Sequence, residues 1–165
     1  MTMLVRLMYA SRAADSVNAD ELAAILKKSK ENNAAVGVTG VLCYCFNADI
    51  FLQVLEGARE AVSALYNRIA QDARHREVVL LHYEEIGERH FSSWSMGQVN
   101  MNRLNPALLL KYSERAELDP YGVSGEASLA FFNELVATAS VVCTCITSST
   151  MLALYTPGTN PAPMP

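Results

Sequence analysis

The sequence lacks the features that mark several large classes of protein. Its 13 Lys and Arg residues are outnumbered by 17 Asp and Glu, for a formal net charge of −4, so the clustered positive charge of a nucleic-acid-binding protein is missing. It contains no Gly-rich phosphate loop, no Gly-x-Ser-x-Gly and no His-Glu-x-x-His motif, which are signatures of many nucleotide-binding and hydrolytic enzymes. The apolar stretch from Leu129 to Leu154 is interrupted by polar residues, so it favours a packed helix over a membrane span.

Cysteine is scarce and spaced unsuitably for a metal site. The four cysteines form two Cys-x-Cys pairs, Cys43 with Cys45 and Cys143 with Cys145, whereas zinc sites usually separate paired cysteines by two to four residues. We therefore expect no metal and interpret the cysteines as free thiols. The start, Met-Thr-Met-Leu-Val-Arg, does not have the pattern of a signal peptide, so we expect a reducing, cytoplasmic setting.

What the chain has in excess is hydrophobic residues. They make up 51% of its 165 residues, and the mean hydropathy is +0.13. This length suits one domain with a short appendage, and a chain of about 150 residues buries roughly 70% of its unfolded surface. The apolar content indicates that the protein either associates with itself or encloses an apolar ligand.

Hydrophobic periodicity divides the first hundred residues into strands and helices. Strands are expected over residues 3–9, 36–46, 50–56, 78–86 and 96–99, and helices over 18–33 and 59–72. Asn18 and Glu21 have the spacing of a capping box at the start of the first helix, and Asn32 and Asn33 are expected to close it. The order strand, helix, strand, strand, helix, strand predicts an α+β, ferredoxin-like βαββαβ sheet with two helices on one face.

The character of the sequence changes after residue 100. We expect a C-terminal helical extension over 101–140, with helices over 106–112 and 124–140 and Ser124 as an N-cap. The second helix has an apolar stripe predicted to pack on the free face of the sheet or on a second subunit; a lid that merely completes the core would show the same stripe. The stripe consists of Leu129, Phe132, Leu135 and Val136. Residues 141–165 are expected to be a partly disordered tail, which leaves 1–100 as the main domain.

Two polar residues stand in otherwise apolar strands. Gln53 interrupts the run from Ile50 to Glu56, and a buried amide costs on the order of 1–3 kcal/mol if it is left unpaired. An outward-facing Gln on an edge strand would explain the same pattern. Tyr9 ends the first strand and could be a core residue whose hydroxyl reaches water. Trp94, the only tryptophan, could be a packing residue.

Taken together, five segments in order resemble the BLUF family of flavin-binding blue-light photoreceptors. The matching segments are Arg6–Ser11, Ser29–Asn33 with Gly37–Leu42, Phe51–Gly57, Arg68–His75 and Trp94–Met96. The resemblance covers about residues 3–100 and continues more weakly through Leu110–Ser113. It departs from the family pattern in the hairpin Cys45–Ile50, which is long.

The resemblance implies that FAD binds between the two helices. Tyr9 matches the photoactive tyrosine and Gln53 the switching glutamine, whose amide turns or tautomerises. The residues that would couple the pocket to the sheet are Ser29, Trp94 and Met96. The cofactor-binding residues implied are Ile25 and Ile69 as apolar walls, with Lys30, Asn32, Asn33, Gln53, Arg68, Asp72, Arg74 and His75 as polar contacts.

The implied function is blue-light sensing without turnover of a substrate. The light state would be relayed to a downstream signalling protein or to a homo-oligomer, a dimer or a larger ring, with neither nucleic acid nor membrane as partner. One alternative is a small flavin-dependent reductase, although the sequence shows no dinucleotide fingerprint for a nicotinamide donor. Another is a ferredoxin-like dimer that binds a small metabolite, with Gln53 merely structural.

Overall fold

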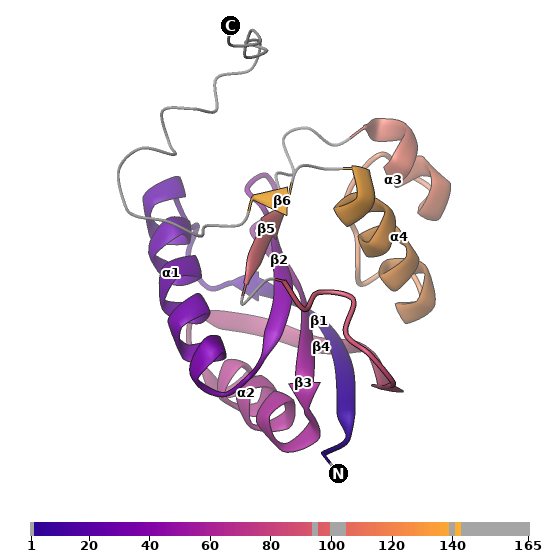
Figure 1. Cartoon of the computed structure of the whole chain (residues 1–165). Coiled ribbons are helices and arrows are strands. Elements are labelled where there is room, and N and C mark those ends of the chain that lie inside the picture. The colour runs from indigo at the N-terminus through magenta and orange to yellow at the C-terminus, as the bar shows by residue number, and fades with distance from the viewer. Residues whose placement is uncertain (1, 94–95, 100–104, 139–140, 143–165) are drawn as a thin grey trace, which may run out of the picture.

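The computed structural model describes residues 2–93, 96–99, 105–138 and 141–142 (Figure 1). The strands are β1 (Leu4–Ala13), β2 (Thr39–Cys45), β3 (Ile50–Ala58), β4 (His75–Ile86), β5 (Gly97–Val99) and β6 (Val141–Val142). The helices are α1 (Ala19–Ala35), α2 (Arg59–Gln71), α3 (Pro106–Tyr112) and α4 (Gly125–Thr138). Within the described residues, no helix has the length and apolar character needed to cross a bilayer.

The strands form one sheet in the order β4-β1-β3-β2-β5-β6. β1 lies antiparallel between β3 and β4, and β2 pairs antiparallel with β3. These four strands with α1 and α2 have the predicted ferredoxin-like topology. β5 adds to β2 in parallel, and β6, which the sequence analysis did not predict, pairs antiparallel with β5.

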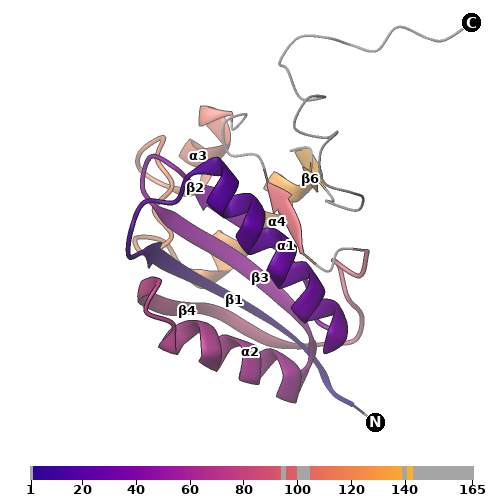
Figure 2. The ribbon, with the colours of Figure 1, turned by 90° about the vertical axis from the view of Figure 1, so that its left-hand side faces the viewer.

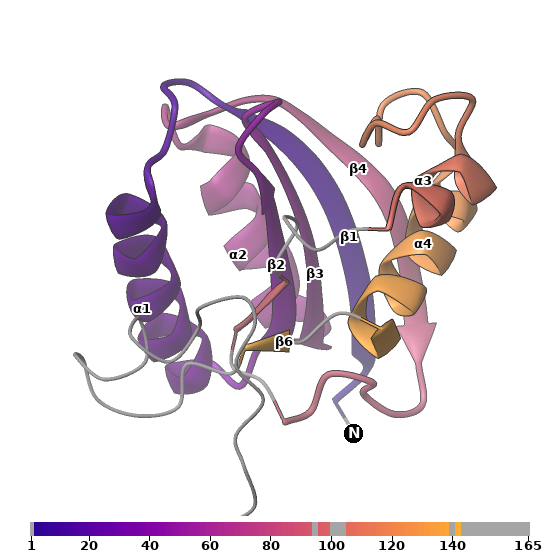
Figure 3. The ribbon, with the colours of Figure 1, turned by 90° about the horizontal axis from the view of Figure 1, so that it is seen from above.

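The sheet has a helix layer on each face. α1 and α2 cover one face, as predicted, and α3 and α4 lie on the other, which we call the far face (Figures 2 and 3). Because side chains alternate along a strand, β1 places Leu7 and Tyr9 in the core beneath α1 and α2, and Met8 and Ala10 in the core of the far face. The two cores therefore meet at one sheet, and a displacement of its strands is felt in both.

α4 packs on the far face through its apolar stripe. Phe132 and Leu135 are buried there with Met8, and Phe132 meets the ring of Phe91 edge-on at 6.2 Å. The expected packing on the free face of the sheet is confirmed. The helix begins very close to β4, since a Cβ at Gly125 would lie 1.7 Å from the carbonyl oxygen of Leu81.

The caps of two helices are confirmed, but the predicted end of α1 is wrong. Asn18 and Glu21 form the capping box, and Ser124 Oγ accepts from the amide of Ala127 at 3.1 Å. Asn32 and Asn33, by contrast, lie within α1, which continues to Ala35. The left-handed conformation occurs after the helix, at Gly37 with φ 69°, because glycine has no Cβ to oppose it.

Candidate functional site

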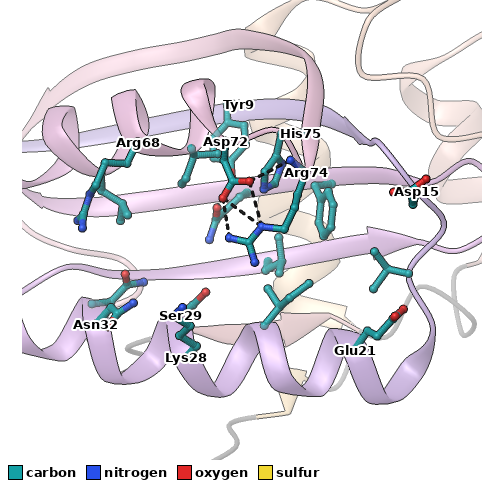
Figure 4. Close-up of a pocket in the computed structure, with 18 of the residues that line it drawn as sticks. Tyr9, Asp15, Glu21, Lys28, Ser29, Asn32, Arg68, Asp72, Arg74 and His75 are labelled. Atoms are coloured by element: carbon teal, nitrogen blue, oxygen red, sulfur yellow. Dashed lines mark hydrogen bonds and ion pairs between the residues drawn. The ribbon is translucent and has the colours of Figure 1, made fainter.

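A cavity of about 570 Å³ lies between α1 and α2 above the sheet (Figure 4). This is within the usual range for small-molecule sites, about 300–1,000 Å³. Its floor is formed by β1, β2 and β3, and its sides by the two helices and by the segments that follow β1 and α2. The lining residues are Tyr9, Asp15, Ser16, Val17, Glu21, Ile25, Lys28, Ser29, Asn32, Asn33, Leu42, Phe51, Gln53, Leu65, Arg68, Ile69, Asp72, Arg74 and His75.

Tyr9 and Gln53 form a hydrogen-bonded pair in the floor. They lie directly opposite each other in the antiparallel register of β1 and β3, and their exposed fractions are 1% and 6%. The hydroxyl of Tyr9 donates to Oε1 of Gln53, and Nε2 of Gln53 donates to Sδ of Met96 at 3.2 Å. Gln53 is thus a buried residue of a central strand, and the interpretation as an outward-facing Gln on an edge strand is wrong.

Burial keeps the hydroxyl of Tyr9 protonated. Desolvation raises the pKa of Tyr9 far above its ordinary value, and the neighbouring Tyr66 raises it further. The two rings lie 5.6 Å apart between centroids. The Tyr9 hydroxyl is therefore protonated at physiological pH and donates its hydrogen bond to Oε1 of Gln53.

The walls of the cavity are apolar, and buried amides interrupt them at defined places. Ile25 from α1 and Ile69 from α2 line it together with Leu65. Asn33 is 2% exposed and lines the same cavity from the last turns of α1. A flat apolar molecule with hydrogen-bonding groups on its edge would match such a surface.

One side of the cavity opening carries a charged group and a histidine. Arg74 pairs with Asp72 at 2.5 Å, and hydrogen bonds from the Arg74 side chain hold the pKa of Asp72 well below its usual value. His75 Nδ1 lies 2.8 Å from Ser11 Oγ. Burial lowers the pKa of His75, which favours the neutral imidazole.

The long hairpin between β2 and β3 has a structural role at the cavity. Tyr44 donates to Asp49 Oδ1 at 2.8 Å and accepts from the amide of Val17 at 3.2 Å. Ser16 Oγ donates to the same carboxylate at 3.0 Å. The hairpin therefore holds the segment between β1 and α1, whose residues Ser16 and Val17 line the cavity.

Most of the residues predicted for the site lie together around this cavity. Those that line it are Tyr9, Ile25, Ser29, Asn32, Asn33, Gln53, Arg68, Ile69, Asp72, Arg74 and His75. Met96 reaches it through its contact with Gln53. Lys30 is half-buried on α1 and is not among the lining residues, and Trp94 lies outside the described residues.

Sequence reasoning missed eight lining residues. Some could have been found from periodicity, because Glu21 and Lys28 share the helix face of Ile25 and Phe51 shares the strand face of Gln53. The others that it missed are Asp15, Ser16, Val17, Leu42 and Leu65. Among the described residues, no group of three His, Cys, Asp or Glu side chains is arranged to hold a metal.

A comparison with models of known protein families gives a match over the region that contains the cavity. The family model for BLUF, sensors of blue-light using FAD, matches residues 4–97. The chain belongs to the BLUF family. The matched range contains β1 to β4 with α1 and α2, and it includes every residue that lines the cavity.

This BLUF chain aligns with nearly the whole length of some similar proteins and with only a small part of others. Photoactivated adenylate cyclase subunit beta of Euglena longa is 36% identical over 94 residues, which are 56% of this chain and 11% of the cyclase subunit. The structure of BlsA in its photo-activated state is 33% identical, with a TM-score of 0.70 over 84% of this chain and 99% of BlsA. Klebsiella pneumoniae BlrP1 with FMN and cyclic diGMP is 25% identical, with a TM-score of 0.58 over 84% of this chain and 31% of that one.

Proposed function

We propose that this BLUF chain senses blue light through a bound FAD and signals by rearranging the hydrogen bonds of Tyr9 and Gln53. The observation that carries the proposal is the buried chain of contacts from the Tyr9 hydroxyl through the Gln53 amide to Met96, which lies directly in the floor of a cavity of suitable size.

The residues around the cavity suit a flavin. A flat ring would lie between the apolar side chains of Ile25 and Ile69, and the buried amides of Asn33 and Gln53 offer donors and acceptors to its polar edge. The remaining proposed contacts are Lys30, Asn32, Arg68, Asp72, Arg74 and His75. When bound, the flavin would supply absorption of blue light and an acceptor for one electron. We propose FAD because the family description names it, although the BlrP1 structure contains FMN.

Tyr9 is suited to give up an electron and a proton together. Its raised pKa means that the hydroxyl does not ionise in the dark. Once an electron leaves the phenol, the proton is no longer held strongly, and its existing hydrogen bond offers a direct route to Oε1 of Gln53. The protein thus supplies the donor and the proton acceptor within one preformed contact.

The amide of Gln53 is suited to act as the switch. In the structure Oε1 accepts from Tyr9 and Nε2 donates to Met96 Sδ. Turning or tautomerising the amide exchanges donor and acceptor positions, so an acceptor would then face the sulfur, which is itself a weak acceptor. Met96 must move in response. Met96 directly precedes β5, and Val99 on β5 packs in the far-face core with Phe132, so a shift of β5 would be felt at α4. Ser29 and Trp94 are the other proposed coupling residues.

The output is proposed to be an interaction and not a reaction of this chain. The similar Euglena longa protein is named a photoactivated adenylate cyclase subunit, and the matched region is only 11% of its length. A region like this chain can therefore be joined to a separate effector region. Here we propose a downstream signalling protein or a change in homo-oligomeric state, and no role for nucleic acid or membrane. The free thiols of Cys43 and Cys45 support a reducing, cytoplasmic location.

The absorption spectrum of the purified protein, loaded with FAD, tests this proposal. We expect a yellow protein whose flavin bands shift slightly to the red under blue light and recover in the dark. A flavin reductase would instead bleach on addition of NADH or NADPH and show no reversible red shift. Protein that cannot be loaded with any flavin would contradict both functions and favour a metabolite-binding module.

A further inference from the structure

A buried carboxylate on the far face is not used by the proposed switch. Glu56 has an exposed fraction of 0% and lies on β3, the strand that also carries Gln53. The two side chains point to opposite faces of the sheet, since three positions separate them along a strand. A fully buried carboxylate needs strong partners, because desolvating its charge is costly.

The partners of Glu56 are one arginine and two backbone amides. Arg6 Nε donates to Oε1 at 2.8 Å. The amide of His90 donates to the same oxygen at 3.2 Å, and the amide of Phe91 donates to Oε2 at 2.9 Å. Hydrogen bonds to an ionised acceptor are roughly twice as strong as neutral ones. Glu56 therefore fixes the backbone of the segment between β4 and β5 at two consecutive residues.

The segment between β4 and β5, which we call the crossing segment, has described residues on both sides of the sheet. Phe91 is buried in the far-face core, whereas Met96 is buried in the core beneath α1 and α2, in contact with the Gln53 amide. One end of the crossing is thus held by Glu56 and the other end meets Gln53. Both of these residues belong to β3, so β3 fixes the crossing segment from both faces.

We propose that Glu56 is a positioning residue of the light response, which sets where Met96 meets Gln53 by holding the backbone at His90 and Phe91. The inference rests on the proposed function of the Gln53 switch. A carboxylate is required because its two oxygens accept three hydrogen bonds. A glutamine has one acceptor oxygen, so its NH₂ group would face either Phe91 N–H or the N–H of His90 and displace the segment.

Glu84 provides a matched control for the loss of charge. It lies on β4 opposite Arg6 and accepts from Arg6 Nη1 at 2.5 Å. Glu84→Gln therefore removes one carboxylate charge from the same arginine as Glu56→Gln does. Its partners, Arg6 and His82, both lie outside the crossing segment. An effect that arises from Arg6 would appear in both variants, whereas an effect of backbone positioning would appear in Glu56→Gln alone.

The experiment measures the dark-recovery rate of the red shift in the full-length, FAD-loaded chain. Glu56→Gln and Glu84→Gln are each made in the wild-type and the Met96→Leu background. Glu56→Gln should change the recovery rate by about threefold or more, as expected for residues coupled through one contact network. Glu84→Gln should leave it within about twofold. In the Met96→Leu background, Glu56→Gln should have no further effect.

Three results would overturn the inference. They are equal effects of Glu56→Gln and Glu84→Gln, a wild-type recovery rate in Glu56→Gln, or an undiminished effect of Glu56→Gln when Met96 is already replaced. If Glu56→Gln fails to retain FAD, Glu56→Asp is used, which keeps the charge but has a shorter reach; unchanged recovery in that variant would refute the inference. A wild-type chain without a red shift would instead refute the proposed function, and this inference with it.

Discussion

Removal of the Tyr9 hydroxyl tests the hydrogen bond in the floor of the cavity. In Tyr9→Phe, Oε1 of Gln53 loses its donor at a residue that is 6% exposed, and an unpaired buried polar group costs about 1–3 kcal/mol. In Gln53→Leu the Tyr9 hydroxyl loses its acceptor, at a similar cost of about 1–3 kcal/mol. In the double variant neither polar group remains, so its loss of stability should be clearly smaller than the sum of the two single losses.

Urea unfolding of the flavin-free protein in the dark measures these free energies. We expect a coupling energy of about 1 kcal/mol or more between the two substitutions. The control pairs Gln53→Leu with Tyr44→Phe, because Tyr44 is also a buried tyrosine but donates to Asp49. That pair should be additive. Additivity of Tyr9→Phe with Gln53→Leu to within about 0.5 kcal/mol would show that the two side chains do not bond, and would refute the geometry from which the switch is argued.

Three further predictions concern the cavity and the far face. Asn33→Ala should weaken FAD binding by about 1–3 kcal/mol, measured by flavin fluorescence titration; unchanged affinity would contradict its proposed role. Gly125→Ala should lower the free energy of unfolding by about 1–3 kcal/mol, because the new Cβ meets the β4 backbone, whereas Gly87→Ala, with open space around it, should not. The pKa of Asp72 is lowered in the folded state, so its contribution to stability is complete above about pH 5 and is lost as the pH falls below about 4. Asp72→Asn should remove that part of the pH dependence, and an identical stability–pH curve would contradict it.

The sequence predicted the fold well where the pattern is local and long. α1 and α2 have clear apolar faces, and the capping box of α1 involves residues three positions apart, Asn18 and Glu21. β6 has two residues, which is too short for any periodicity to emerge. The end of α1 was misplaced because asparagine tolerates the left-handed conformation without requiring it, and the chain adopts that conformation at Gly37 instead.

The candidate site was predictable from the family resemblance more than from single residues. The strand of Gln53 allowed both an exposed and a buried amide, and its burial depends on β1 and β2, which pair on either side of β3. The residues of the β3 segment alone do not indicate which strands pair with it. The same holds for Glu56, whose backbone partners at His90 and Phe91 are distant in the sequence. Ser16 and Val17 were missed because a connecting segment has no periodic pattern.

The most direct test of the central claim is the light-minus-dark absorption spectrum of FAD-loaded wild-type, Tyr9→Phe and Gln53→Leu proteins. Each variant keeps the apolar walls and the Asn33 amide, so each should bind FAD and be yellow. The wild type should show the reversible red shift, and both variants should lack it, because one has no hydroxyl to donate and the other has no amide to reorient. A wild-type red shift that persists in either variant would contradict the assignment of the Tyr9–Gln53 pair as the light switch.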